Sequence, residues 1–441
     1  MFRKRNLIAF LTFFLSLTLA LPAGTGAVER ARSKRSPGTA HPGKPAGDPA
    51  AGQINTRSAV LVEVSTGATL LEQEPDLIIE PASFTKVLTL YLVFEAIHQG
   101  LVKMSDEIYV SETAWRTGGS KMFVGVGSRI PLEELIKGIT VVSGNDACVA
   151  VAEHLYGSVE GFVHAMNRKA RELGMTRSRF LNPHGLPAEG QVTTARDMAG
   201  LCLSYLQRFP ESLHYHSMRE FTYNNIVQYN RNHLLLKDPS VDGLKTGYVA
   251  AAGYHLAATA KRDGTRLLAV VMGATTPGIR EREALRLLNY GFRQFVLIQP
   301  FPEGKPVAAL KVWKGLKDQL DLYPQGPAGF LIAQAQKNSL RWEVQAPKEV
   351  TAPVRANQQL GELVFYVGDQ PSRTVPLASR EDIPLAGWFK RAWQSILLFP
   401  SLDWKVVTGV LAGLSLFGLA LLFVASRRSS GPKRPRSPAS R

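Results

Sequence analysis

Near its end the chain carries an uncharged, mostly apolar run of twenty residues, Val406–Ala425. A helix needs about 20 such residues to cross the hydrocarbon core of a bilayer. Residues 427–441 follow with six lysines and arginines and no acid, and basic flanks of this kind remain in the cytoplasm. We therefore predict a transmembrane anchor over 405–426 and a basic cytoplasmic tail, with the preceding chain outside the cytoplasm. A buried core helix is the alternative.

A second apolar run stands at the other end of the chain. Three basic residues at positions 3–5 precede Leu7–Leu21, and the small residues of Ala23–Ala27 follow. This order is that of a secretory signal peptide, and the run is shorter than the roughly 20 residues of a membrane span. We predict a signal peptide over 1–27, with an uncleaved anchor as the alternative. The Pro- and Gly-rich residues 28–52 are expected to form a disordered linker.

The charge of the chain is concentrated at its ends. The 441 residues hold 52 Lys and Arg against 36 Asp and Glu, a formal charge of +16. Segments 1–27, 28–50 and 427–441 contribute +3, +3 and +6, so only +4 remains for the rest of the chain. An internal basic stripe with interleaved aromatic residues is missing from the sequence, which disfavours a nucleic-acid partner. Two cysteines, Cys148 and Cys202, are too few for a disulfide framework.

Hydrophobic periodicity and turn residues divide the remaining chain into two domains. Residues 53–299 mix helical and strand patterns, whereas residues 300–384 show the short alternating runs of a small β-rich domain. Residues 385–404 place aromatic residues at helical spacing and predict an amphipathic interfacial helix, with an ordinary packed helix as the alternative. The elements expected in the larger domain are a hairpin over 58–71, helices over 83–98, 131–141, 146–156 and 280–298, and strands over 254–260 and 266–273.

Three short motifs contain the candidate chemical groups: Ser83-Phe84-Thr85-Lys86, Ser143-Gly144-Asn145 and Lys245-Thr246-Gly247. A Ser-x-x-Lys motif is expected about once by chance in a chain of this length, whereas Lys-Thr-Gly is expected about 0.1 times. Each motif also falls in the local structure that its chemistry requires: a helix start, a break between helices and a strand. The joint pattern is therefore more specific than any single motif.

Ser83 and Lys86 are suited to act as a nucleophile and its base. Ser83 stands at the predicted start of a helix, where unpaired N–H groups stabilise developing negative charge. Lys86 lies one turn further along the same face and can reach the Ser83 hydroxyl. A serine needs such a base, and a lysine can serve only if desolvation or a neighbouring cation lowers its pKa. Lys245 is the candidate for that cation.

The second and third motifs supply groups that would position a substrate. Ser143 and Asn145 place a hydroxyl and an amide in the break between two predicted helices, which is more rigid than a loop. Gly247 lies on a predicted strand, where the missing side chain would let a substrate backbone lie against the strand edge. These residues are therefore candidates for substrate contacts.

In longer form the motifs resemble the signatures of low-molecular-mass penicillin-binding proteins, the serine-type D-alanyl-D-alanine carboxypeptidases. The segments that carry the resemblance are Pro81–Lys86, Val142–Asp146, Asn182–Leu186, Thr194–Met198, Tyr229–Asn232, Val241–Tyr248 and Arg280-Glu281. The similar region covers residues 55–298. It implies an α/β (α+β) catalytic domain over 53–299, like that of β-lactamases and DD-peptidases, with a mixed sheet and a helical subdomain. The β-rich domain and the C-terminal transmembrane helix match the family's layout.

The resemblance also implies how the reaction would proceed. Ser83 would attack the carbonyl between the two terminal D-alanines of a peptidoglycan pentapeptide stem, and Lys86 would take its proton. Ser143 would relay a proton to the departing D-alanine, and water would hydrolyse the acyl-enzyme. No metal or cofactor is required. β-Lactam antibiotics would acylate the same serine as covalent inhibitors, and the membrane bilayer would be the further partner.

Substrate contacts are implied for the remaining motif residues. Asn145 would hydrogen-bond the substrate amide, and the terminal carboxylate would bind Lys245 and Thr246, with Arg280 as the second cation. The backbone N–H groups of the nucleophile and of Tyr248 would form the oxyanion hole. Gly144 stands where serine acyltransferases usually have Asp, in a Ser-Asp-Asn motif. The resulting Ser-Gly-Asn is similar to the carboxypeptidase version.

Two other functions remain as alternatives. A class A β-lactamase needs a glutamate between the second and third motifs to activate water, and no candidate lies in a Glu-x-x-Leu-Asn context: Glu172, Glu189, Glu211 and Glu220. A non-catalytic β-lactam sensor or wall-binding scaffold would place its domain after membrane helices and a cytoplasmic protease. The sequence contains neither of these segments.

The histidines and Cys148 give weaker signals. His184 follows a turn and either borders the site or is structural. Cys148 is expected to be a small packing residue in a helix. No spacing typical of metal ligands occurs among the other conspicuous histidines, which are His214, His216, His233 and His255. The sequence therefore predicts no metal site.

Overall fold

The computed structural model describes residues 52–397, 408–409, 412–413 and 415–420. The expected signal peptide, the linker up to residue 51 and the basic tail lie outside these residues. Most of the expected transmembrane anchor, 405–426, lies outside them as well. Among the helices of the described residues, none is both long and apolar enough to cross a membrane.

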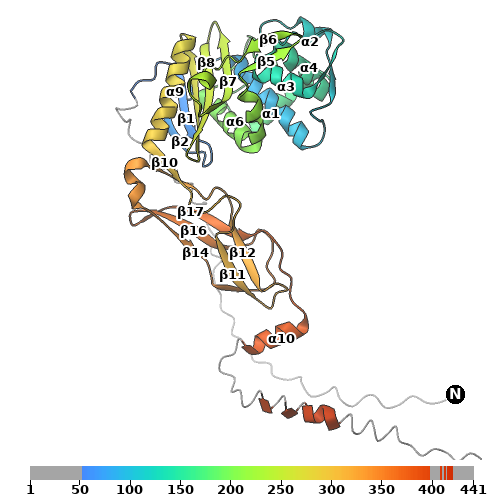
Figure 1. The fold of residues 1–441 in the computed structure, drawn as a ribbon, viewed down its shortest axis with the longest axis vertical. Coiled ribbons are helices and arrows are strands. Elements are labelled where there is room, and N and C mark those ends of the chain that lie inside the picture. The colour runs from blue at the N-terminus through green and yellow to red at the C-terminus, as the bar shows by residue number, and fades with distance from the viewer. Residues whose placement is uncertain (1–51, 398–407, 410–411, 414, 421–441) are drawn as a thin grey trace, which may run out of the picture. The chain divides into compact units, whose positions relative to one another are not determined.

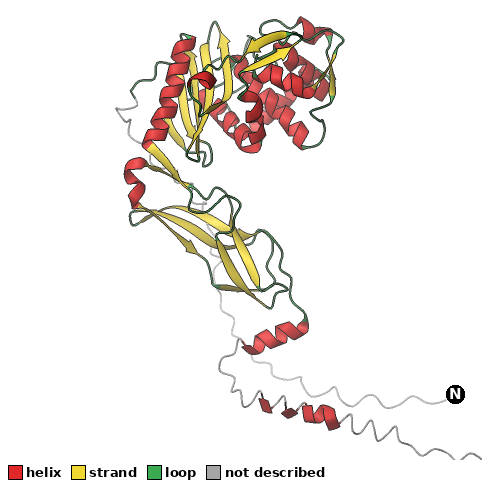
Figure 2. Cartoon of the chain, viewed as in Figure 1, coloured by secondary structure: helices red, strands yellow, loops and turns green. Residues whose placement is uncertain are grey.

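A five-stranded antiparallel sheet forms the centre of the larger domain (Figures 1 and 2). Its strand order is β2-β1-β9-β8-β7, so the first hairpin of the chain pairs with strands that come much later in the sequence. The strands are β1 Ser58–Glu63, β2 Thr69–Gln73, β7 Val241–Val249, β8 Gly253–Arg262 and β9 Thr265–Ala274. Strand β7, which carries the third motif, is an edge strand of this sheet.

Both faces of the sheet are buried. Along β9, Leu268 and Val270 pack in one hydrophobic core with helices α1 and α6, whereas Leu267 and Ala269 pack in a second core with α9. Adjacent side chains of a strand point to opposite faces, so a sheet covered on both sides has a nearly continuous apolar strand. The three helices are α1 Thr85–His98, α6 Ala195–Arg208 and α9 Pro277–Gln294.

Shorter elements complete the helical part of this domain. Helix α1 is buried on nearly all its faces, in agreement with its apolar sequence, and so gives the first motif a rigid support. The other helices are η1 Ala82–Phe84, α2 Glu112–Arg116, α3 Leu132–Thr140, α4 Asn145–Tyr156, α5 Val159–Glu172, η2 Pro210–Ser212, α7 Leu213–His216 and α8 Leu234–Lys237. Two hairpins pair β3 Glu107–Tyr109 with β4 Arg129–Pro131, and β5 Glu220–Tyr223 with β6 Ile226–Tyr229.

The mixed sheet implied by the resemblance is wrong, because every neighbouring pair of strands in the five-stranded sheet is antiparallel. The individual elements expected in the larger domain are confirmed except at two places. The helix predicted from residue 83 starts later, because Ser83 lies in the 3-10 turn η1 and α1 begins at Thr85. The helix predicted over 280–298 is wrong in its last residues, because α9 ends at Gln294 and Phe295–Ile298 form strand β10. Aromatic and β-branched side chains favour a strand there.

The smaller domain is built on a six-stranded sheet in the order β14-β16-β17-β12-β11-β15. All neighbours are antiparallel except β11 and β15, and β10 pairs separately with β13. The elements are β10 Phe295–Ile298, β11 Ala308–Trp313, β12 Gln319–Pro324, β13 Phe330–Ala333, η3 Gln334–Ser339, β14 Leu340–Gln345, β15 Glu349–Thr351, β16 Gln359–Val367 and β17 Gln370–Ser379. This domain has its own hydrophobic core, and α10 Trp388–Leu397 follows it.

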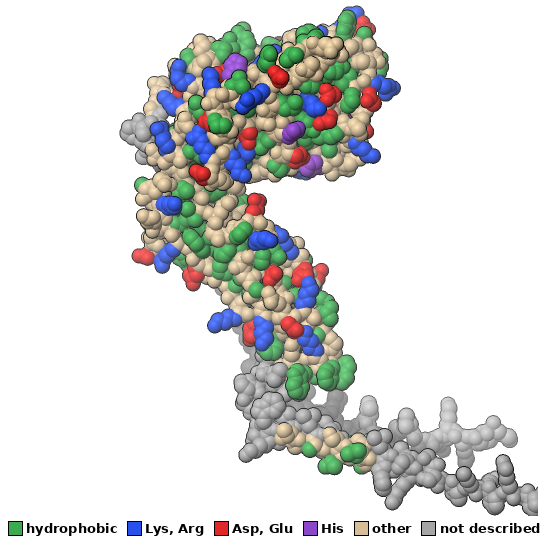
Figure 3. Space-filling model, viewed as in Figure 1, with side chains coloured by type: hydrophobic (Ala, Val, Ile, Leu, Met, Phe, Trp, Pro, Cys, Tyr) green, Lys and Arg blue, Asp and Glu red, His purple; other side chains and the backbone are tan. Residues whose placement is uncertain are grey.

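The surface of the described residues carries mixed charge. On the face shown in Figure 3, basic and acidic side chains are interspersed along both domains. That face has no continuous basic patch of the kind that binds nucleic acid. This distribution agrees with the charge count, which assigns most of the basic excess to the two ends of the chain.

Candidate active site

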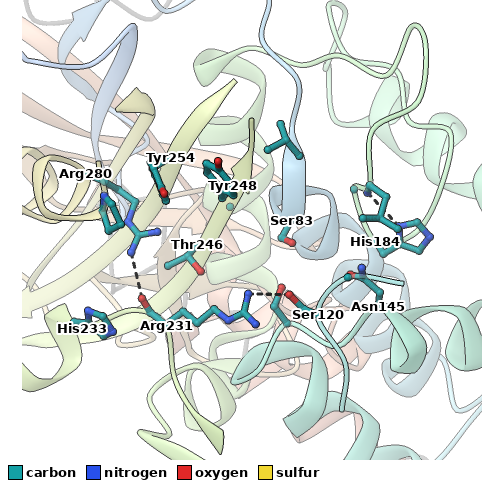
Figure 4. Close-up of a pocket in the computed structure, with 17 residues that line it drawn as sticks. Ser83, Ser120, Asn145, His184, Arg231, His233, Thr246, Tyr248, Tyr254 and Arg280 are labelled. Carbon is teal, nitrogen blue, oxygen red and sulfur yellow. Dashed lines mark hydrogen bonds between the residues drawn. The ribbon is translucent and has the colours of Figure 1, made fainter. Parts of the chain in front are cut away.

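A cavity of about 390 Å³ lies where the three motifs meet (Figure 4). Turn η1, the corner between α3 and α4, and strand β7 each contribute to it. Most of the site residues predicted from the sequence line this cavity, namely Ser83, Ser143, Asn145, Thr246, Gly247, Tyr248 and Arg280. Lys86 and Lys245 are not among the lining residues, and they are buried, with 0% and 3% of each residue exposed.

Lys86 is the centre of a hydrogen-bond network beside the cavity. Its Nζ lies 3.0 Å from Oγ of Ser83, 2.7 Å from Oδ1 of Asn145 and 2.6 Å from the carbonyl oxygen of His184. The amide oxygen of Asn145 and the carbonyl oxygen of His184 can only accept hydrogen bonds, so each accepts one from an N–H group of the Lys86 amine. In the neutral amine the lone pair is therefore left for the hydroxyl hydrogen of Ser83.

The surroundings of Lys86 favour its neutral form. Burial lowers the pKa of Lys86 to about 8. The Asp146 carboxylate opposes this shift, and the positive charge of Arg231 adds to it. A lysine in this state has a substantial neutral fraction near neutral pH, which is what a general base requires.

Ser143 and Asn145 occupy the corner between α3 and α4. Ser143 has a φ of +63°, in the left-handed region that non-glycine residues seldom adopt. Its buried hydroxyl has no hydrogen-bond partner among the described residues. Asn145 donates from Nδ2 to the carbonyl oxygen of Gly118 at 2.7 Å, while its Oδ1 accepts from Lys86. The corner thus presents an unpaired hydroxyl and a fixed amide to the cavity.

Lys245 is buried on strand β7, at the side of the site that the sheet forms. Its Nζ donates to the carbonyl oxygen of Thr246 at 3.2 Å. Burial lowers the pKa of Lys245 well below its usual value, and the positive charges of Lys86 and Arg231 lower it further. The positive charge of Lys86 thus disfavours the charged form of Lys245, whereas the cation that lowers the pKa of Lys86 is Arg231 rather than Lys245, the candidate from the sequence.

Two glycines let separate segments approach the turn that carries Ser83. At Gly247 on β7, an added Cβ would lie 3.3 Å from Cβ of Ala82 and 3.4 Å from the backbone nitrogen of Ser83. At Gly185, which has a φ of +87°, an added Cβ would lie 1.7 Å from the carbonyl oxygen of Ala82. Gly185 therefore needs glycine for packing around the nucleophile, and an added Cβ at Gly247 would make a tight contact there, a reason beyond the space expected for a substrate.

A cationic and aromatic rim completes the cavity (Figure 4). Arg280 donates from Nη2 to the carbonyl oxygen of Arg231 at 3.3 Å, and its buried Nε has no hydrogen-bond partner among the described residues. Arg231 donates from Nη1 to Oγ of Ser120 at 2.8 Å. The rings of Tyr248 and Tyr254 stack with their centroids 4.3 Å apart. Two guanidinium groups on one rim suit an anionic ligand such as a carboxylate.

Sequence reasoning did not single out Arg231, Ser120 or Tyr254 as site residues. Arg231 stands in Tyr229–Asn232, a segment that carries the family resemblance, and that signal was sufficient to nominate it. Ser120 and Tyr254 belong to no motif, and the fold alone brings them to the cavity.

The buried histidines have structural partners. His216 and His255 donate to the backbone carbonyl oxygens of Leu244 and Glu80, at 2.8 and 3.0 Å. Burial lowers their pKa values to about 3 and about 4, so both rings are neutral at physiological pH. His184 lines the cavity, where it supplies a carbonyl oxygen to Lys86, and burial lowers the pKa of its ring to about 4.

No group of three or more His, Cys, Asp or Glu in the described residues is arranged to hold a metal ion. His214 is exposed, and His233 lines the cavity with its Nδ1 3.0 Å from Oε1 of Glu281. Cys148 is buried in α4, and burial raises the pKa of its thiol to about 12. Its thiol therefore stays protonated and packs as a small apolar group.

The glutamates considered for a β-lactamase, Glu172, Glu189, Glu211 and Glu220, are not among the described residues that line the cavity. Glu172 pairs with Lys169 at 2.6 Å, and Glu211 pairs with His98 at 2.6 Å. Glu189 lines a separate cavity of about 240 Å³. None of them is placed to activate water at Ser83.

An antiparallel sheet between two helical layers, with a buried lysine of α1 beside a serine of the preceding 3-10 turn, is the arrangement of an active-site-serine hydrolase. The motifs agree with that class. The chain belongs to the D-alanyl-D-alanine carboxypeptidase family, which residues 44–276 match, and residues 295–385 match the C-terminal domain of penicillin-binding protein 5. It is accordingly a serine-type carboxypeptidase with an α/β catalytic domain and a C-terminal β domain.

Individual relatives resemble the chain over most of their length. The D-alanyl-D-alanine carboxypeptidase DacC of Escherichia coli (strain K12) is 36% identical over 354 residues, 78% of this chain and 88% of the relative. The crystal structure of penicillin binding protein 5 from Haemophilus influenzae matches with a TM-score of 0.66 and 34% identity, over 75% of this chain and 98% of the other. An ampicillin-bound penicillin-binding protein D2 from Listeria monocytogenes matches with a TM-score of 0.50 and 27% identity, over 54% and 98%.

Proposed function

We propose that this chain removes the terminal D-alanine from peptidoglycan pentapeptide stems, with Ser83 as nucleophile and Lys86 as its base. The geometry around Lys86 carries the proposal. Nζ of Lys86 lies 2.7 Å from Oδ1 of Asn145 and 2.6 Å from the backbone carbonyl oxygen of His184, two atoms that can only accept hydrogen bonds. The lone pair of the neutral amine is then directed at Oγ of Ser83, 3.0 Å away.

In acylation, Oγ of Ser83 forms a bond to the carbonyl carbon between the two terminal D-alanines while its proton passes to Lys86. The N–H groups of Ser83 and Tyr248 stabilise the negative charge that develops on the carbonyl oxygen. When the C–N bond breaks, the leaving nitrogen takes a proton through the hydroxyl of Ser143, which has no hydrogen-bond partner among the described residues. The products are D-alanine and an ester on Ser83.

Water completes the cycle. It attacks the ester carbonyl, its proton passes to Lys86, and Ser83 leaves as the alcohol while the shortened stem leaves as a carboxylate. A β-lactam would follow the same first step, except that its leaving nitrogen stays attached to the acyl group after the ring opens. We therefore propose that penicillin forms a long-lived adduct on Ser83.

The rim cations would recognise the terminal carboxylate of the stem. Arg280 has a buried Nε without a partner among the described residues, and Arg231 lies next to it. Thr246 lines the same part of the cavity, with Lys245 behind it. Asn145 would hydrogen-bond the substrate amide while keeping its contact with Lys86. A substrate whose terminal carboxylate is neutralised should therefore bind poorly.

We also propose that the enzyme acts outside the cytoplasm and is held at the membrane. The apolar runs over 1–27 and 405–426 support export and anchoring. Helix α10 supports an interfacial contact, because Trp388 and Phe389 are 74% and 72% exposed while Lys390 bonds to the β domain. Cell fractionation of the full chain against one ending at residue 397 tests this. Equal release of both into the soluble fraction contradicts the anchor.

Mass spectrometry of the intact protein after incubation with penicillin tests the catalytic proposal. The wild type should gain the mass of one penicillin and release D-alanine from a D-Ala-D-Ala peptide, and Ser83→Ala should do neither. Ser204→Ala is the control, since Ser204 lies on α6 and bonds to Tyr91 rather than lining the cavity. Rapid turnover of penicillin would indicate a β-lactamase, and an adduct on Ser83→Ala would refute the assignment of the nucleophile.

A further inference from the structure

The carboxylate of Asp146 is buried, with 1% of the residue exposed, and it binds backbone N–H groups. Oδ1 accepts from the nitrogens of Met122 at 2.9 Å and Ala147 at 3.0 Å. Oδ2 accepts from the nitrogens of Phe123 at 2.9 Å and Val124 at 3.2 Å. Three of these four donors are consecutive residues of one loop. An ionised carboxylate is suited to this contact because both of its oxygens only accept.

The other part of the same loop, residues 118–120, contacts Asn145. The carbonyl oxygen of Gly118 accepts from Nδ2 of Asn145 at 2.7 Å, and the carbonyl oxygen of Ser120 accepts from the backbone nitrogen of Asn145 at 2.7 Å. At Gly119, an added Cβ would lie 2.6 Å from Nδ2 of Asn145. Because Nδ2 is committed to the loop, Oδ1 is the amide atom that meets Lys86.

The loop adopts a conformation that needs support. Phe123 has a φ of +67°, a strained backbone conformation for a non-glycine residue. Phe123 is 49% exposed, so burial of its ring does not account for this conformation. Two hydrogen bonds hold the backbone at this point: the Phe123 nitrogen donates to Asp146, and the Phe123 carbonyl oxygen accepts from Nδ2 of Asn224 at 3.1 Å. The same loop carries Ser120, whose Oγ accepts from Arg231 across the cavity.

We propose that Asp146 is a positioning residue for acylation: its carboxylate fixes loop 118–124, and the loop orients the Asn145 amide so that Oδ1 holds Lys86 toward Ser83. Asp146 itself does not line the cavity, so it acts through the loop. The inference rests on the roles proposed above for Lys86 and Ser83. It adds a structural cause for the orientation of Asn145 that the motif alone does not contain.

Asp146→Asn keeps the size of the side chain but replaces one acceptor with a donor that faces an N–H group. We expect the rate constant for acylation by a fluorescent penicillin to fall about 10- to 100-fold, since misplacement by about 1 Å has an effect of this size. A purely electrostatic role would act in the opposite direction. The charge of Asp146 raises the pKa of Lys86, so its removal alone would increase the neutral fraction and speed acylation below the pKa.

Asp197→Asn is the matched control. Asp197 is also buried in the first turn of a helix, where its Oδ2 accepts from the nitrogen of Arg177 at 3.0 Å and from Oγ of Ser178 at 2.7 Å. It does not line the cavity. Both variants should lower the melting temperature, but only Asp146→Asn should slow acylation per folded molecule. Equal acylation rates in Asp146→Asn, Asp197→Asn and the wild type would overturn the proposal.

A double-mutant cycle separates this role from a general effect on the fold. In an Asn145→Ala background the Asp146→Asn change should have little further effect on acylation, because the two residues act in series. Full additivity would count against the proposal. Loss of the adduct in Ser83→Ala tests the proposed nucleophile separately. If Asp146→Asn does not fold, amide exchange in the wild type decides: rapid exchange at Met122, Phe123 and Val124 would refute the carboxylate contact.

Discussion

Oγ of Ser83 lies 3.0 Å from Nζ of Lys86, although the two residues stand on different elements, turn η1 and helix α1. The 3-10 turn leaves Ser83 partly exposed at the cavity, whereas Lys86 is completely buried. A nucleophile needs access to substrate, and a basic lysine needs desolvation. The change from the 3-10 turn to the α-helix meets both needs within one turn of chain.

The pH dependence of acylation should report Lys86. Burial lowers its pKa to about 8, and only the neutral amine can accept the proton of Ser83. Acylation by a fluorescent penicillin should therefore rise with pH and level off above about pH 8, with a decrease of about tenfold per unit well below it. A rate constant that stays flat between about pH 6 and about pH 8 contradicts Lys86 as the base.

Lys86→Arg tests the same group by substitution. A guanidinium remains protonated at every accessible pH, so this variant should lack acylation across the whole pH range rather than show a shifted profile. Lys137→Arg serves as the control, because Lys137 pairs with Glu134 at 2.7 Å away from the cavity. It should keep the rate and profile of the wild type.

Replacing Ser143 with glycine should raise the stability of the protein and abolish its activity. The φ of +63° at Ser143 is strained for serine but not for glycine. Ser143→Gly should therefore raise the free energy of unfolding by about 1 kcal/mol and still abolish D-alanine release, because the proton relay is lost. Ser143→Ala should lose activity without that gain. Urea denaturation and D-alanine release measure the two effects, and a fully active Ser143→Gly enzyme would exclude the relay.

The sequence predicts which chemical groups the site contains better than it predicts the hydrogen bonds between them. The motifs identify Ser83 and Lys86, and the positions of the apolar residues predict the sheet and α1. The sequence does not reveal that the carbonyl oxygen of His184 accepts from Lys86, because any residue type supplies a carbonyl. Nor does it reveal Ser120, whose contact with Arg231 joins segments 111 residues apart. Such contacts depend on tertiary packing, which local pattern does not encode.

Arg280 should determine the need for a terminal carboxylate. Replacing Arg280 with Met removes a buried charge from the rim, and a lost charged hydrogen bond of about 1.5–3 kcal/mol raises KM roughly 10- to 100-fold. The wild type should prefer a D-Ala-D-Ala peptide over the same peptide with a C-terminal amide, and Arg280→Met should lose most of that preference. Arg282→Met is the control, since its side chain is 61% exposed. Unchanged preference in Arg280→Met would place carboxylate recognition elsewhere.

Gly185 should matter for both stability and acylation, and Gly174 allows the two causes to be separated. Both glycines have positive φ, +87° and +75°, so alanine strains either backbone by about 1–2 kcal/mol. At Gly174 an added Cβ meets nothing within 4 Å, whereas at Gly185 it would lie 1.7 Å from the carbonyl oxygen of Ala82. Gly174→Ala should therefore lose only the strain energy and keep its acylation rate. Gly185→Ala should lose more stability and displace the turn that carries Ser83, so penicillin acylation per folded molecule should fall. If the two variants acylate equally fast, the approach of Gly185 to Ala82 does not position the nucleophile.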